Sequence, residues 1–133
     1  MPVRTKQTAG GSAYASPFIG RVDDVLHVKV DISALTQAEV DANGILKPGV
    51  PLTINGLLIG ANNTDRVGVT PYETKIADNN TNLAGITADV FVAVAFSGSV
   101  NRDVMEDNLG RVLSANEIAG LNGVGSNLTM TLT

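Results

Sequence analysis

The segment at residues 88–96 (ADVFVAVAF) constrains the fold of this chain more than any other part of it. Its side chains alternate between two faces, and both faces are apolar. One face carries Val90, Val92, Val94 and Phe96, and the other carries Phe91, Ala93 and Ala95. A strand with two apolar faces lies inside a packed sheet or has one face covered by another subunit. We therefore predict a central strand whose second face, the one with Phe91, is an oligomer interface.

A second strand is predicted over residues 25–32 (VLHVKVDI), where apolar and polar side chains alternate. Leu26, Val28, Val30 and Ile32 share one face, which we expect to be buried. His27, Lys29 and Asp31 share the other face. His27 is the single histidine of the chain, and this pattern places it on the surface.

The rest of the chain favours short strands and tight turns. Val, Ile and Thr suit strands, while the abundant Gly and Asn suit the turns between them. Asn55-Gly56 lies between the apolar runs 52–54 and 57–59 and predicts a hairpin. Further strands are expected at 66–70, 72–76 and 128–132.

Two or three short helices are also predicted. Thr36 with Glu39, and Ser114 with Glu117, have the spacing of a capping box, which opens a helix. A further helix is expected to start at residues 101–103 and to end near Gly110. The fold class is therefore mainly β with two or three short helices, in a small barrel-like or sandwich single domain with an extended N-terminal arm.

The arm is set apart by its charge. Residues 1–21 carry Arg4, Lys6 and Arg21 and no acid, so their charge is +3, whereas residues 22–133 carry −7, for a net charge of −4. We divide the chain into this arm (1–21) and a β-rich body (22–133). The large apolar residues of the arm, Tyr14, Phe18 and Ile19, are expected to anchor it on a partner. The acidic body argues against nucleic acid as that partner.

Composition offers little support for catalysis. The chain has no Cys, and hence neither a disulfide nor a thiolate metal site. It has no apolar run long enough to cross a membrane, and no secretory signal is evident. Asp103 and Asp107 have helical i, i+4 spacing that a divalent cation could use, but solvated charge near a helix start is the preferred interpretation. We predict no catalytic, cofactor or metal site, and therefore no enzyme.

A sequence pattern across residues 44–113 resembles a known family. It comprises the turn 44–52 (GILKPGVPL), the Gly-Ala step in 57–61, the Gly-Val strand 67–70, the apolar strand 90–95, and the segments 100–102 and 109–113. This pattern resembles the head decoration (capsid cement) proteins of tailed bacteriophages, including the lambda-like group. The chain departs from the lambda protein in its low aromatic content, its lack of Trp and its longer C-terminal region.

The resemblance implies a homotrimer on the outer surface of the virion capsid, made in the host cytoplasm. Such proteins stabilise the expanded shell against the pressure of packed DNA. Their N-terminal arm contacts the major capsid protein, a role that here falls to Arg4, Lys6, Tyr14, Phe18 and Ile19. The alternatives are a β-rich tail, fibre or surface adhesin module, and a small metal-dependent hydrolase that uses Asp or Glu.

Overall fold

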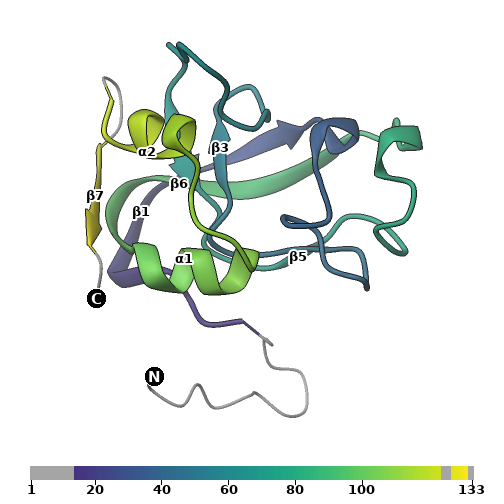
Figure 1. Ribbon diagram of the computed structural model, residues 1–133, viewed down its shortest axis with the longest axis horizontal. Coiled ribbons are helices and arrows are strands. Elements are labelled where there is room, and N and C mark those ends of the chain that lie inside the picture. The colour runs from purple at the N-terminus through teal and green to yellow at the C-terminus, as the bar shows by residue number, and fades with distance from the viewer. Residues whose placement is uncertain (1–13, 124–126, 132–133) are drawn as a thin grey trace.

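A computed structural model describes residues 14–123 and 127–131, and these form mainly β-structure (Figure 1). The strands are β1 (Phe18–Val30), β2 (Ile45–Leu46), β3 (Pro51–Thr53), β4 (Val67–Val69), β5 (Thr74–Lys75), β6 (Val90–Asn101) and β7 (Asn127–Thr131). The helices are α1 (Arg102–Leu109) and α2 (Ala115–Leu121), with two short 3₁₀ turns, η1 (Ile32–Ala34) and η2 (Leu83–Gly85). The predicted fold class is confirmed.

The long strand β6 organises the main sheet, as its sequence predicts. β1 pairs antiparallel with β6 along one edge, while β4 and β7 pair with its other edge. β3 continues the sheet beyond β4, and β2 and β5 form a separate two-stranded sheet. The backbone N–H of Asp31, just after β1, donates to the carbonyl of Gly56, just after β3. This bond links the ends of the two outer strands of the main sheet, β1 and β3, as expected for a barrel-like body.

The core lies against one face of β6. Val92, Val94 and Phe96 are essentially fully buried, together with Leu52 and Met105 from neighbouring elements. The guanidinium of Arg66 lies over the Phe96 ring, 4.8 Å from its centroid, and this cation–π contact closes the core at its edge.

The helices α1 and α2 connect the parallel strands β6 and β7 (Figure 1), and both bury apolar residues, Met105 and Leu121 among them, in the same core. Asn101 caps α1, because its side chain accepts a hydrogen bond from Val104 N, and Gly110 ends the helix with a φ of 73°. Ser114 and Glu117 form the predicted capping box of α2. Both helices start where the sequence places them.

Leu26, expected to be buried with Val28 and Val30, is 40% exposed. Two predictions of secondary structure are also wrong. Thr36 starts a single turn rather than a helix, because Val40 forms a β-bridge with Leu46. The turn at Asn55-Gly56 forms, and Thr53 N donates to Leu57 O, but residues 57–59 are not a strand. β3 pairs instead with β4, because the longer-range pairing buries all three residues of each strand.

Candidate protein-binding surface

The N-terminal segment lies on its own subunit from Tyr14 onward. Asn108 of α1 donates to the carbonyl of Ala15 at 2.9 Å, and Asn101 N donates to that of Pro17 at 2.8 Å. Phe18 pairs with Val100 at the start of β1, and its side chain is buried, with only 8% exposed. Phe18 is therefore a core residue, and its buried side chain is not accessible for the predicted contact with a capsid partner.

The predicted boundary between arm and body also requires correction. β1 starts at Phe18 rather than near residue 25, so residues 18–21 belong to the body. Gly20 and Asp24 have positive φ values of 77° and 55°, and the strand bulges between Ile19 and Asp23. This bulge brings Asp24 into an ion pair with Arg66. Sequence alternation alone does not reveal a strand that is interrupted in this way.

The other arm residues have different placements. Ile19 is 48% exposed and remains free to contact a partner. Tyr14 is partly buried, and its hydroxyl donates to Asp41 Oδ2 at 2.5 Å. Burial, this bond and the charges of Asp41 and Glu73 raise the pKa of Tyr14. The predicted contacts of Arg4 and Lys6 lie outside the described residues.

An apolar strip runs along the outward face of the ladder between β1 and β6. In register, Val25 pairs with Ala95, His27 with Ala93, and Lys29 with Phe91. Phe91 is 57% exposed and Val25 is 37% exposed, while Ala93 is partly exposed. We call Val25, His27, Ala93 and Phe91 the outer strip. A large exposed aromatic side chain beside smaller apolar ones is the kind of patch that proteins use to bind one another.

Only part of the predicted oligomer interface is accessible on this strip. Phe91 is exposed and Ala93 is partly exposed. Ala95, in contrast, is completely buried and pairs with both Val25 and Val69. Ala95 therefore supports the sheet and does not reach a partner. The contribution of Val25 was not predicted, although pairing the two apolar segments in register would have placed it beside Ala95.

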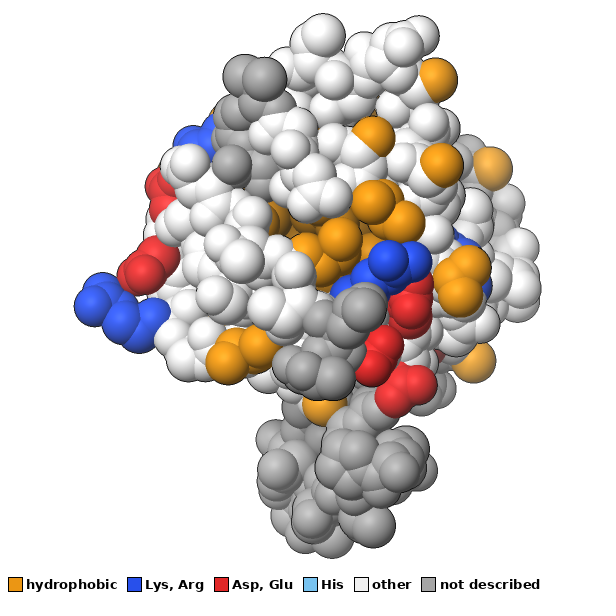
Figure 2. Space-filling view, turned by 60° about the vertical axis from the view of Figure 1, so that its left-hand side comes forward, with side chains coloured by type: hydrophobic (Ala, Val, Ile, Leu, Met, Phe, Trp, Pro, Cys, Tyr) orange, Lys and Arg blue, Asp and Glu red, His pale blue; other side chains and the backbone are white. Residues whose placement is uncertain are grey.

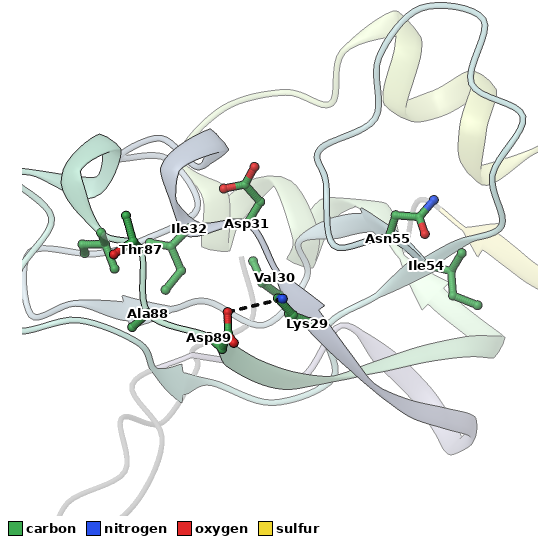
Figure 3. Close-up of a pocket in the computed structure, with 10 residues that line it drawn as sticks. Lys29, Val30, Asp31, Ile32, Ile54, Asn55, Thr87, Ala88 and Asp89 are labelled. Carbon is green, nitrogen blue, oxygen red and sulfur yellow. Dashed lines mark ion pairs between the residues drawn. The ribbon is translucent and has the colours of Figure 1, made fainter.

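A cavity of about 450 Å³ lies at one end of the outer strip (Figure 3). Its polar lining includes Lys29, Asp31 and Asp89, and its apolar lining includes Ile54 from the turn after β3. Lys29 Nζ lies 3.3 Å from Asp89 Oδ1, and both side chains are largely exposed. Lys29 pairs with Phe91 in register. The Lys29–Asp89 ion pair therefore lies between Phe91 of the outer strip and the cavity that both charged residues line.

Figure 2 shows a second face, on the side of the molecule that carries β7. Apolar side chains gather near its centre, with acidic and basic side chains beside them. In this part of the fold Ile118 of α2 and Met130 of β7 are partly buried and pack against the core. They are less exposed than Phe91, so the outer strip is the better candidate for binding.

The most buried charges form a structural network. Arg111 reaches Glu39 at 3.0 Å and Glu117 at 2.7 Å, and these two carboxylates are almost completely buried. Burial alone would raise the pKa of Glu117, but its bonds to Arg111 and to the Ser114 cap outweigh burial and lower it. The network ties the turn at residues 36–40 to α2.

Within the described residues no three His, Cys, Asp or Glu side chains lie together as metal ligands. Over the same residues, no helix is long and apolar enough to cross a membrane. His27 lies on the exposed side of β1, as predicted. No family model, curated protein or solved structure matches the chain.

Proposed function

We propose that this chain is a structural virion protein that binds the outer surface of an expanded phage capsid as a homotrimer. The observation that carries the proposal is the outer strip, in which Phe91, 57% exposed, and Val25, 37% exposed, lie on neighbouring strands of one sheet. The identity of the partner rests on the resemblance of residues 44–113 to capsid decoration proteins. In this proposal the outer strip joins copies of the chain, and the N-terminal arm contacts the major capsid protein.

The arm in this proposal is shorter than the charge boundary suggests. Phe18 is buried and Tyr14 is bonded to Asp41, so these residues fix the base of the arm on its own subunit. The residues left to contact the shell are those before Tyr14, which include Arg4 and Lys6, together with exposed Ile19.

Stabilisation of a shell follows from mass action. A protein that binds the expanded lattice and not the unexpanded one shifts the equilibrium toward expansion by its free energy of binding, repeated at every site. A trimer presents three arms at once. Weak contacts by single arms then add to strong binding, because the second and third contacts form within one complex.

Deleting residues 2–13 tests the role of the arm. The deletion spares Tyr14 and β1, so we expect unchanged thermal unfolding together with loss of cosedimentation with expanded shells. The control is full-length protein in which exposed Val112 (72% exposed) is replaced by Ser, which should bind as wild type does. Shell binding that survives the deletion would contradict the role of the arm.

Replacing Phe91 by Ser tests the outer strip separately. The side chain is more than half exposed, so its loss should change stability by less than about 1 kcal/mol. We expect the trimer to be lost from shells imaged by electron microscopy, while Val112→Ser leaves it intact. An unchanged trimer in Phe91→Ser would place the subunit interface elsewhere.

A further inference from the structure

A cavity of about 580 Å³ lies between α2 and the loop that joins β3 to β4 (Figure 1). Residues 60–65 of this loop form one wall. The other wall carries Asn116, Ala119, Gly120 and Gly123, which have the i, i+3, i+4 and i+7 spacing of one helix side. The volume is within the range of roughly 300–1,000 Å³ that is typical of small-molecule sites.

Both walls of this cavity are held in place by contacts within the protein. Asn63 Nδ2 donates to Asp65 O at 2.9 Å, and Asp65 N donates to Asn63 Oδ1 at 3.3 Å. Asn55 Nδ2 donates to Asp65 Oδ2 at 3.1 Å. On the helix side, a Cβ added at Gly120 would meet Ile59 Cγ2 at 2.9 Å, so α2 lies close to the residue that precedes the loop. The cavity is therefore already formed by the folded chain.

The polar side chains of the cavity have hydrogen-bonding groups that the protein does not use. Asn62, Thr64 and Asn116 are exposed, and their side chains make no hydrogen bond to another described residue. Asp65 Oδ1 likewise has no partner in the described part of the chain, and it is open to solvent. Two amides, a hydroxyl and a carboxylate oxygen together offer both donors and acceptors to a ligand.

The charges around the cavity restrict the class of ligand. Among the lining residues, Asp65 is the only one with a charged side chain. The neighbouring Arg66 is turned away, because its guanidinium pairs with Asp24 and lies over the Phe96 ring. The lining therefore offers no cation to an anionic ligand. One carboxylate is also too few for a metal ion, which takes several oxygen ligands.

The remaining side chains of the lining are small. Its apolar side chains are those of Ala61 and Ala119. A peptide needs pockets for its larger side chains, and an apolar molecule needs hydrophobic and aromatic walls. Small residues with amide, hydroxyl and carboxylate groups suit instead a compact ring that carries several neutral hydroxyls. A carboxylate is an especially strong acceptor for such hydroxyls.

We propose that this cavity binds a neutral saccharide. Asp65 accepts from the hydroxyls of one sugar ring, Asn116 bonds to the ring from the opposite wall, and Asn62 and Thr64 add bonds from the loop. No aromatic side chain is present among the lining residues to stack on the ring, so we expect a dissociation constant on the order of millimolar. The cavity shares no residue with the outer strip. Its failure to bind a saccharide would leave the proposed function standing.

Titration of the full chain, followed by NMR, tests the proposal. The probes are the methyl glycosides of glucose, galactose, mannose and N-acetylglucosamine. We expect at least one of them to shift the signals of Asn62, Asp65 and Asn116, with saturation in the millimolar range. The absence of shifts at these residues with all four probes would overturn the proposal.

Two control ligands separate a saccharide site from weaker or different binding. Sorbitol carries the hydroxyls of a hexose on a flexible chain, so it should bind at least about tenfold more weakly than the best glycoside. Trialanine tests for a site that takes neutral peptides, and we expect no shift with it. Equal shifts with sorbitol, or shifts with trialanine and with no glycoside, would also contradict the proposal.

Two variants locate the sugar in the cavity. Ala119→Leu fills the cavity from an exposed position of α2 and should abolish binding without changing thermal unfolding. Asn116→Ala removes one amide and should weaken the best glycoside by about three- to tenfold. The matched control is Ala42→Leu, at an exposed position outside the cavity, which should bind as wild type does. Undiminished affinity in either cavity variant would refute this assignment of the site.

Discussion

Replacing Arg111 by Met should be among the most damaging single changes in this protein. Arg111 Nη2 lies 3.0 Å from Glu39 Oε2, and Arg111 Nη1 lies 2.7 Å from Glu117 Oε1. The Glu39 side chain is 1% exposed and that of Glu117 is 5% exposed. Met preserves most of the volume of the Arg stem but removes the charge. Two buried carboxylates are then left without their cation.

The expected loss can be estimated from these contacts. Breaking a buried ion pair by removing one partner costs roughly 3–5 kcal/mol. The Arg111 side chain is 33% exposed, so water screens part of the interaction and the low end applies. Thr36 and Ser114 still donate to the carboxylates. We therefore expect about 3 kcal/mol at pH 7, which for a domain of this size lowers the Tm by roughly 10 °C.

The stability lost in Arg111→Met should depend on pH. The pKa of Glu117 is lowered in the native protein, so its contribution to stability is present above about pH 4.3, the ordinary Glu value, and is lost as pH falls below it. Without Arg111, burial dominates and raises the pKa of Glu117. The unpaired, buried carboxylate therefore lowers the free energy of unfolding at pH 7, and this loss becomes smaller as the carboxyl gains a proton at lower pH. Wild type and variant should therefore differ less at pH 4.5 than at pH 7.

Urea denaturation at both pH values measures the difference. The matched control is Arg21→Met, because Arg21 pairs with Asp23 on the surface with its side chain 87% exposed. It should change stability by less than about 0.5 kcal/mol at either pH. A penalty for Arg111→Met that is the same at pH 4.5 and pH 7 would refute the electrostatic explanation and indicate lost packing instead.

Two further pairs of variants test the fold. Gly56→Ala should cost more than about 2 kcal/mol in urea denaturation, since the residue has a φ of 79° and a Cβ there would meet Lys29 O at 1.9 Å. Gly110→Ala, with a similar φ of 73° and open space around it, should cost only about 1 kcal/mol; equal losses would contradict the predicted clash. Phe18→Ala should cost about 3–4 kcal/mol as a core truncation, whereas Ile19→Ala, at an exposed position, should cost less than about 1 kcal/mol. A small loss for Phe18→Ala would show that the start of β1 contributes little to the core.

Local patterns in the sequence predicted the elements that depend on local chemistry. The Asn101 cap of α1 and the Ser114 capping box of α2 are where the sequence indicates. Strand β6 is also found, but it continues to Asn101, beyond the predicted end at residue 96. Thr36 has the same capping spacing as Ser114 but yields only one turn. The difference is tertiary, because Val40 pairs with Leu46 and the buried Glu39 is held by Arg111 from a distant part of the chain. A local sequence pattern does not predict such long-range partners.

The candidate surfaces were only partly predictable for the same reason. Phe91 was recognised because it lies on the second apolar face of a strand. Ala95, on the same face, is buried by pairing with β4, which the alternation does not reveal. The charge pattern places Phe18 in the arm, whereas in the structure it pairs with Val100 of β6 and is buried. The cavity lined by Lys29, Ile54 and Asp89 combines three distant segments and has no signature in the sequence.

The measurement that tests the capsid proposal most directly is cosedimentation of the full chain with shells of the major capsid protein encoded with it. We predict saturable binding to expanded shells, in multiples of three copies per local threefold position, and no binding to unexpanded shells. Equal binding to both kinds of shell, or to neither, would contradict a role in stabilising the expanded capsid.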